Sequence, residues 1–403
     1  MSSADLTVDG PLPDEARNFS LFIGGPLFQL LRRAHLVDDA LRLVKRRMVL
    51  AMAVTWLPLL AFSALQGHLW GDGTALPFGR DIECHVRFLL VVPLLIWAEP
   101  FVFVRMRSWV AQFYERNLIP LADRPRFEAA VASALRLRNS VLAEVLLIAL
   151  VYGVGVLVVW RHFVAFHASS WYAIVGAGEP KLTLAGLWFV WLSIPLLQFL
   201  LCRWYFRLFI WARFLWQVSR IRLELLATHP DRAGGLGFLN GSLRAFMPVV
   251  LAHGALAAGQ IANKILYAGE KLPEFILEIF FVAVFLVCLF VAPLMVFAPQ
   301  VTETRRRGLR QYGVLAQGYV RAFDNKWLRG GAPADEPLLG SGDVQSLADL
   351  GNSFGVIESM RLTPVSKLAV VELVAGFLAP IAPLALTLMP PEKLIQSLIG
   401  LVL

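Results

Sequence analysis

Residues 273–298 read PEFILEIFFVAVFLVCLFVAPLMVFA, and their only charged side chains are Glu274 and Glu278, near one end. A helix needs about 20 mostly apolar residues to cross the roughly 30 Å of hydrocarbon in a bilayer. A run of this length and composition therefore predicts a membrane-spanning helix. The same pattern recurs elsewhere in the chain, so the number of such runs decides the fold.

Five more runs resemble this one, and a last run is interrupted by Pro380 and Pro383. In chain order the seven runs are Met48–Gly67, Phe88–Met106, Val141–Phe163, Leu184–Trp204, Arg244–Ala268, Pro273–Ala298 and Leu368–Met389. Proline inside a helix removes a hydrogen bond and bends the axis, so the last run either crosses with a kink or dips in and returns. The predicted fold class is all-α: a polytopic membrane protein with six or seven transmembrane helices and cytoplasmic helical extensions.

The composition agrees with a membrane protein. Of the 403 residues, 58% are hydrophobic and only 16% are charged, and a soluble protein of this size would need more charge to cover its surface. We interpret the net charge of +8 as the positive-inside bias and as attraction to anionic membrane lipids, and we expect no nucleic-acid partner. The three cysteines predict no disulfide framework, and no motif predicts a cofactor.

The basic residues between the runs predict the orientation. From the N-terminus onward, the connecting segments carry 7, 2, 7, 2, 7, 1 and 9 Lys and Arg residues, with the ends of flanking helices included. Cytoplasmic loops are enriched in these residues. The alternation places the N-terminus in the cytoplasm and the protein in a bacterial-type inner membrane. Because Met1–Arg17 is polar and acidic and no basic region precedes an apolar one, we expect no cleaved signal peptide.

The predicted spans divide the chain into four parts. Residues 1–47 form a cytoplasmic N-terminal segment, in which Pro26–Met48 is typical of a basic amphipathic helix lying on the membrane. Residues 48–298 form a six-helix transmembrane core. Residues 299–367 form a cytoplasmic helical segment with a linker, and residues 368–403 form a kinked membrane segment with an interfacial tail.

Two helical extensions are expected on the cytoplasmic side. The fourth span continues inward as one helix to about Ala227, with arginines among tryptophans at the headgroup level. Residues 301–328 extend the sixth span, and a linker rich in Gly, Pro and Ala follows over residues 329–343. Apolar side chains then repeat at helical spacing from Val344 to Ile357, with Ser341 or Asp343 as the N-cap.

Ionisable and polar groups inside predicted spans are the first candidates for function, because they are costly in lipid. Glu99 is followed by Pro100 near the middle of the second span, which suggests an ion or proton site at a helix kink. A neutral, hydrogen-bonded glutamate that supports the kink is the structural alternative. In the fifth span, His253, Gln260 and Lys264 share one face and either line a pathway or join helices.

Other charged groups near the span ends have structural interpretations. Lys264 and Glu278 lie at similar depth on a helical hairpin, so we expect them to form an ion pair. Glu144 and Glu372 lie near the inner ends of their spans and predict salt bridges to arginines such as Arg138 and Arg361.

A glycine-rich loop, HPDRAGGLGF over residues 229–238, lies between the fourth and fifth spans. Such loops expose backbone N–H groups that can hold an anion. Arg232 with Gly234, Gly235 and Gly237 is therefore a candidate site for an anion or a lipid headgroup. The alternative is a turn that joins two helices, since the loop matches no nucleotide-binding motif.

Metal binding and catalysis receive little support. Cys84, His85, His162 and His167 fall in or beside predicted outside loops, but their spacing matches no metal motif and they are weak metal candidates. No nucleophile and base occur in a known arrangement, so no catalytic residue is predicted and an enzyme is the less favoured class.

Two stretches, HPDRAGGLGFL at residues 229–239 and SGDVQSLADLGNSFGVIESMRL at residues 341–362, resemble an uncharacterised family of bacterial multipass membrane proteins. The resemblance covers much of the chain from about Val141 onward. It implies a bacterial inner membrane, and it implies no activity and no site residues.

The leading functional hypothesis is a channel or transporter for a small ion or solute, based on Glu99 and on the polar face of the fifth span. The alternative is a non-transporting scaffold, sensor or partner subunit that acts through its basic cytoplasmic surface on an unknown protein partner. A third class is a membrane enzyme acting on lipid or envelope precursors. Small residues on the fifth span make a homo-oligomer possible.

Overall fold

The computed structural model describes residues 43–71, 75–159, 170–174, 181–333 and 335–388, together with residues 21, 24 and 29. This part of the chain is almost entirely helical. Its one strand pair, β1 (Ala173–Ile174) and β2 (Lys181–Leu182), is antiparallel and lies in a loop. The all-α fold class is confirmed.

Thirteen α-helices are found in the described residues. They are α3 (Val44–Leu65), α4 (Ile82–His85), α5 (Val92–Glu115), α6 (Arg124–Arg138), α7 (Val141–Leu150), α9 (Leu184–Trp188), α10 (Ile194–Val218), α11 (Asn240–Ala245), α12 (Met247–Asn263), α13 (Ile276–Met295), α14 (Ala298–Phe323), α15 (Gly342–Glu358) and α16 (Lys367–Leu378). Several of these helices follow one another without a loop, and short breaks near prolines separate them. Proline causes such breaks because it lacks the N–H that an α-helix needs. Thus π-helical turns at Val86–Val91 and Phe189–Ser193 directly precede the starts of α5 and α10, where Pro93 and Pro195 lie.

Within the described residues, five continuous helices are long and apolar enough to cross a membrane. They are Val44–Leu65, Ile82–Glu115, Leu184–Val218, Leu236–Ala268 and Leu272–Met295. Two bent pairs raise the number to seven if each pair counts as one span: Leu121–Arg138 with Val141–Gly155, bent by 49°, and Lys367–Leu378 with Ala382–Leu388, bent by 56°. The second bend lies where Pro380 and Pro383 predict it.

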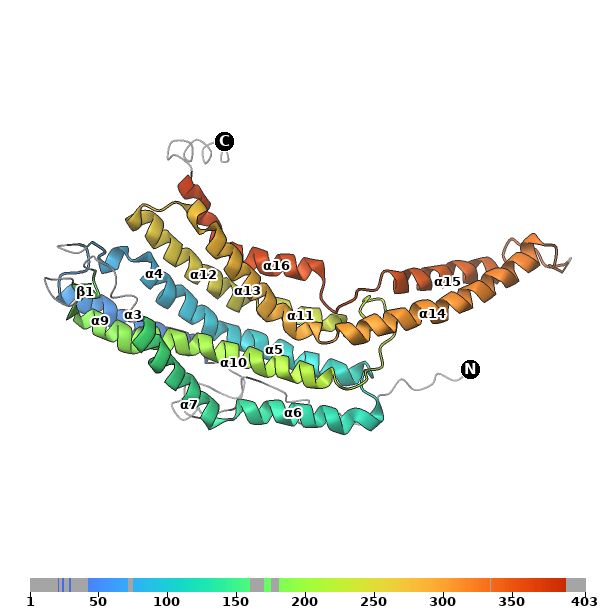
Figure 1. The fold of residues 1–403 in the computed structure, drawn as a ribbon, viewed down its shortest axis with the longest axis horizontal. Helices are drawn as coiled ribbons and strands as arrows, with labels where there is room; N and C mark the ends of the chain where they lie inside the picture. Colours follow the sequence, from blue (N-terminus) through green and yellow to red (C-terminus); the bar gives the residue numbers. More distant parts are fainter. Residues whose placement is uncertain are drawn as a thin grey trace.

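The long helices form an elongated bundle in which α3, α5, α10 and α12 run alongside one another (Figure 1). The exposed faces of α3 and α13 are apolar, with Leu57 50% and Phe280 57% exposed. By contrast, α12 lies at the centre, and its small residues touch neighbours within the chain. A Cβ added at Gly254 would lie 2.2 Å from the Phe377 carbonyl oxygen of α16. The close approach expected from these small residues therefore serves packing inside one chain.

The α14–α15 pair extends away from the bundle as a helical hairpin (Figure 1). The predicted helix over Val344–Ile357 is confirmed as α15, with Ser341 at its N-cap position. Lys326 Nζ holds the end of the hairpin through bonds to Glu336 Oε1, at 2.6 Å, and Asp343 Oδ2, at 2.9 Å. Apolar side chains of the hairpin remain exposed, since Val314 is 76% and Leu339 90% exposed.

The structure corrects one expectation about a helix end, and a second expected helix lies largely outside the described residues. The helix of the fourth run ends at Val218 and does not reach Ala227. Gln300 of α14 explains the end, because its Nε2 donates to the carbonyls of Ser219 and Ile221, and its Oε1 accepts from the Leu223 N–H. The side chain of Gln300 thus satisfies backbone carbonyl and N–H groups that a longer helix would have paired with one another. The expected interfacial helix at residues 26–48 lies largely outside the described residues.

Candidate functional site

Glu99 lies in α5, one residue before Pro100, and only 3% of it is exposed. Its two carboxylate oxygens face α3 and α10. Arg47 Nη2 donates to Oε2 at 2.6 Å, and Arg207 Nη2 lies 2.8 Å from Oε1. Arg203 Nη1 lies 3.7 Å from Oε1. One buried carboxylate therefore holds three guanidinium groups from two other helices, and we call these four residues the Glu99 cluster.

The Glu99 cluster lies at one depth along the bundle. Glu99 is 17 residues from Ile82, Arg47 is 18 from Leu65, and Arg203 is 19 from Leu184, and these three helix ends lie at the same end of the bundle. At about 1.5 Å per residue the distance is roughly 26–29 Å. This distance is close to the roughly 30 Å thickness of bilayer hydrocarbon. If those helix ends mark one face of a membrane, the cluster lies at the opposite face.

Three guanidinium groups of the cluster face the single carboxylate of Glu99, and Glu144 also acts electrostatically on Arg203. Arg47 Nη1 is buried and has no hydrogen-bond partner in the described part of the chain. The Arg207 guanidinium carbon lies 5.2 Å from the centre of the Trp204 ring, and Trp204 in turn donates from Nε1 to the Leu95 carbonyl. Aromatic packing therefore shields the cluster from water on one side.

Sequence reasoning found Glu99 but missed its three partners. Arg47 was expected in a surface helix, and Arg203 and Arg207 at the lipid headgroups. The usable signal was spacing, because Arg203 and Arg207 are four residues apart and therefore share a helix face. That face also carries the buried Trp211. The structure favours an ion-paired Glu99 over the neutral glutamate considered as the structural alternative.

The other pathway candidates do not join the Glu99 cluster. His253 Nδ1 lies 2.7 Å from the Val249 carbonyl oxygen, which can only accept, so Nδ1 carries the proton and Nε2 accepts from the Tyr205 hydroxyl at 2.6 Å. Both ring nitrogens are therefore occupied. Gln260 is exposed on the surface of α12. All three residues lie on α12 or its π-helical continuation, and no hydrogen bond or ion pair joins any of them to Glu99 in the described part of the chain.

Of the predicted ion pairs, that of Lys264 with Glu278 is wrong, whereas Glu372 does form a salt bridge to an arginine. Lys264 Nζ lies over the Phe275 ring, 5.0 Å from its centre, and no ion pair with Glu278 exists among the described residues. The reason is that Glu278 points outward and is exposed. The expected salt bridge of Glu372 to an arginine is confirmed, and the arginine is Arg244, whose Nε and Nη2 donate to the two carboxylate oxygens at 2.7 and 2.8 Å.

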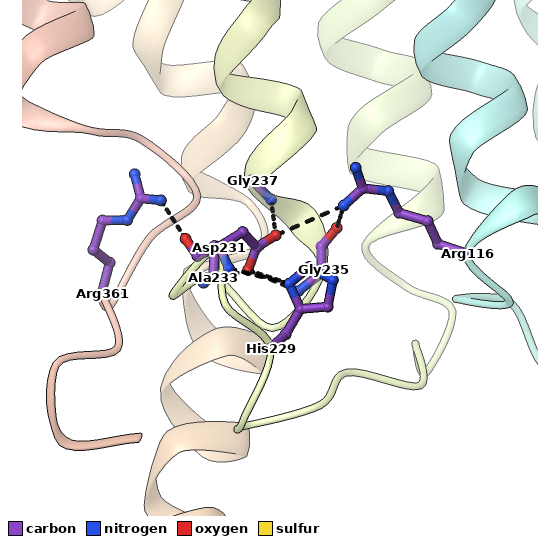
Figure 2. Close-up of polar contacts among 7 residues, drawn as sticks. All are labelled: Arg116, His229, Asp231, Ala233, Gly235, Gly237 and Arg361. Atoms are coloured by element: carbon purple, nitrogen blue, oxygen red, sulfur yellow. Dashed lines mark hydrogen bonds and ion pairs between the residues drawn. The ribbon is translucent and has the colours of Figure 1, made fainter. Parts of the chain in front are cut away.

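The glycine-rich loop closes around Asp231 (Figure 2). The backbone N–H groups of Ala233 and Gly235 donate to Asp231 Oδ1 at 2.8 and 3.1 Å, and the Gly237 N–H donates to Oδ2 at 2.7 Å. Gly235 has φ +101°, a value that favours glycine and turns its N–H inward. Burial acts to raise the pKa of Asp231, but these backbone hydrogen bonds outweigh it and hold that pKa below 3.8.

The loop is also tied to two distant segments. Arg116, at the end of α5, donates from Nη1 to the Gly235 carbonyl at 3.1 Å and lies 3.8 Å from Asp231 Oδ2. Arg361, before α16, donates from Nη2 to the Asp231 carbonyl at 2.6 Å (Figure 2). Arg232 is exposed with φ +55°. The structure thus brings the four anion-site candidates together, but Asp231 already accepts from the N–H groups of Gly235 and Gly237.

Two of the weak metal candidates, Cys84 and His85, lie near a second buried carboxylate, Asp81. Asp81 Oδ1 accepts from the Cys84 N–H at 2.9 Å and from Asn263 Nδ2 at 2.8 Å, and its Oδ2 accepts from Trp171 Nε1 at 2.8 Å. His85 Nδ1 accepts from Trp56. No group of three or more metal-ligating side chains is found among the described residues. His162 and His167 lie outside them, and Asp81 organises this end of the bundle.

Taken together, fold and site define a helical protein whose described residues contain five to seven candidate membrane spans and a buried ion-pair cluster. Comparison with protein-family models, with curated proteins and with solved structures finds no match.

Proposed function

We propose that this chain is a multipass protein of a bacterial inner membrane that moves a small ion or solute across it. The single observation that carries the proposal is the Glu99 cluster, in which four ionisable side chains are buried between helices of membrane-spanning length. Charged groups are costly at such positions and mark ion or solute pathways in membrane proteins. The uncharacterised bacterial family, which the sequence resembles, agrees with this location.

The proposed orientation puts the N-terminus in the cytoplasm. The alternating Lys and Arg counts support it, and the cluster then lies at the cytoplasmic edge of the hydrocarbon. With this orientation, the Asp231 loop and the α14–α15 hairpin face the cytoplasm. Six spans, or seven if the bent α16 segment crosses, account for the apolar runs.

The proposed pathway passes the buried face of α3. That face carries Arg47, Thr55 and Ser63, and Ser63 Oγ is buried with no hydrogen-bond partner in the described residues. Ser193 Oγ of the neighbouring helix donates to the Thr55 carbonyl at 2.8 Å. Polar groups therefore continue from the cluster toward the far end of α3, whereas the hydrogen bonds of His253 leave it no free nitrogen.

Ion and solute flux into liposomes that contain the purified protein tests the proposal. We expect flux at least about tenfold above that of empty liposomes, and a loss of most of it in Glu99→Gln. The matched control is Glu278→Gln, because Glu278 is an exposed carboxylate on α13. His253→Ala should retain most of the flux. Each variant is compared at equal amounts of folded protein, measured by size-exclusion chromatography.

Equal loss of flux in the Glu99→Gln and Glu278→Gln variants would contradict a pathway at Glu99. Flux no higher than in empty liposomes, over a range of pH and voltage and for cations and anions alike, would count against transport. Cations and anions are both tested because the proposed function specifies no coupling ion.

The α14–α15 hairpin favours a second candidate, a scaffold or partner subunit. It extends from the bundle, and Val314 and Leu315 on α14 are 76% and 56% exposed. Exposed apolar side chains on a rigid, projecting element are typical of a protein contact. Photo-crosslinking from Leu315 would test it, with Phe280 of α13 as the control. Absent flux together with a protein cross-linked only from Leu315 would favour this candidate.

A further inference from the structure

The Glu99 cluster has hydrogen-bond donors that the protein does not use. Arg47 is 8% exposed, and its Nη1 atom is buried without a partner in the described chain. Its Nη2 atom binds Glu99. A buried donor without an acceptor is costly, so such groups in native proteins usually meet a water, an ion or a ligand.

Arg203 has spare donors in the same place. It is 9% exposed, and its only ion pair within the described residues is the 3.7 Å approach of Nη1 to Glu99 Oε1. This distance is too long for a hydrogen bond. A guanidinium group carries five N–H donors in a fixed plane. Two arginines that face one carboxylate from opposite helices therefore leave most of their donors unused.

The open donors select the sign of the missing partner. Guanidinium groups offer only N–H donors, and those of the cluster surround the single carboxylate of Glu99. A cation would meet repulsion from these arginines. An anion would accept the hydrogen bonds that Arg47 and Arg203 leave open.

We infer that Arg47 and Arg203 form a binding site for an oxyanion beside Glu99. The planar fork of arginine suits two oxygens of a phosphate, sulfate or carboxylate group, which it binds through paired, charge-assisted hydrogen bonds. An oxyanion is then the substrate class of the transport proposed above, and the role of the site rests on that proposed function. Since the cluster lies at a proposed edge of the hydrocarbon, the oxyanion is either a free solute or the phosphate of a lipid headgroup.

Binding is tested with sulfate on the full-length protein in nanodiscs of phosphatidylcholine. Isothermal calorimetry and the midpoint of thermal unfolding are followed during titration, against chloride at equal ionic strength. We expect saturable binding and a rise of the midpoint with sulfate alone. Wild-type protein with no saturable response to sulfate or to inorganic phosphate would overturn the site.

Arg47→Gln and Arg46→Gln form a matched pair, because the two arginines are neighbours and Arg46 is exposed. We expect at least a tenfold weaker sulfate affinity in Arg47→Gln and an unchanged affinity in Arg46→Gln. Equal affinities in the two variants would overturn the proposal. If Arg47→Gln fails to fold, Arg47→Lys retains the charge beside Glu99 but lacks the fork. The Arg47→Lys variant should fold and bind sulfate at least tenfold more weakly than the wild type. Unchanged sulfate affinity in that variant would contradict the site.

Nanodiscs that contain phosphatidylglycerol separate the two sources. If sulfate affinity falls in these nanodiscs for the wild type, and native mass spectrometry finds retained phosphatidylglycerol that Arg47→Gln loses, the ligand is a lipid headgroup. If sulfate affinity is unchanged, the ligand is a free oxyanion. The flux assay remains independent of both results: sulfate binding without flux keeps the site and contradicts transport, and flux without sulfate binding does the reverse.

Discussion

Glu99 is a buried carboxylate and Asp231 a partly exposed one, and different parts of the chain neutralise them. Glu99 binds guanidinium groups from α3 and α10, and its hydrogen-bonded partner Arg47 is 52 residues away in sequence. Asp231 accepts from backbone N–H groups two, four and six residues ahead. The Glu99 cluster is therefore a tertiary structure, whereas the Asp231 loop is a local one.

The two sites also differ in how completely their donors are used. Around Asp231 each carboxylate oxygen has a backbone donor, and Arg116 lies at 3.8 Å as an additional charge. Around Glu99 the donors exceed the acceptors, and Arg47 Nη1 stays without a partner in the described residues. A saturated site is suited to holding a loop in place, whereas a site with unused donors is suited to binding a ligand. This contrast predicts different responses to mutation.

The largest effect is expected from removal of the Glu99 charge. Glu99→Gln leaves three buried guanidinium groups without their common partner, and breaking a buried ion pair from one side typically costs about 3–5 kcal/mol. Chemical unfolding in detergent micelles measures the loss of stability. The control Glu278→Gln should change stability by less than about 0.5 kcal/mol, as exposed substitutions usually do.

A double variant sharpens this result. Arg207→Met in the Glu99→Gln background removes one of the guanidinium groups that faced the lost carboxylate, so it should recover part of the lost stability. If the second substitution instead adds its own full cost, the two side chains do not interact energetically and the ion-pair account of the cluster is wrong.

A smaller loss is expected at the local site. Asp231→Asn turns one acceptor into a donor that faces the backbone N–H groups of the loop, and hydrogen bonds to a charged group contribute about 1.5–3 kcal/mol. The same unfolding measurement applies, with Asp349→Asn on the exposed face of α15 as the control. A loss no larger than that of the control would mean that the loop does not depend on its carboxylate.

The pH dependence of stability should show whether the charge of Asp231, and not only the shape of its side chain, stabilises the loop. Its pKa in the folded protein lies below its ordinary value of 3.8, because backbone N–H groups bind the charged form against the opposing effect of burial. A depressed pKa gives stability that is fully present above about pH 4 and is lost as the pH falls through the folded pKa. The difference in unfolding midpoint between the wild type and Asp231→Asn should therefore shrink as the pH falls below about 4. A difference that stays constant at low pH would contradict this assignment.

The same contrast explains what the sequence could and could not predict. Runs such as residues 273–298 are apolar over their whole length, and the period of Val344 to Ile357 is helical, so these elements follow from local patterns. Pairing across helices is different. Nothing near Glu99 in sequence identifies Arg47 as its partner, and the glycines of the loop indicated an anion without indicating that Asp231 supplies it.

The smallest effect is expected from Arg116→Gln, and it completes the comparison. Arg116 is 35% exposed and lies 3.8 Å from Asp231, and ion pairs of this kind contribute about 0–1 kcal/mol. The side chain of glutamine also retains a donor for the Gly235 carbonyl. Chemical unfolding should therefore give a loss of less than about 1 kcal/mol. Arg207→Gln, which removes a guanidinium at 2.8 Å from the buried Glu99, serves as the counterpart and should cost several times more. Similar losses in the two variants would mean that Asp231 depends on its arginine as Glu99 does, and that the local hydrogen bonds of the loop do not suffice to hold its charge.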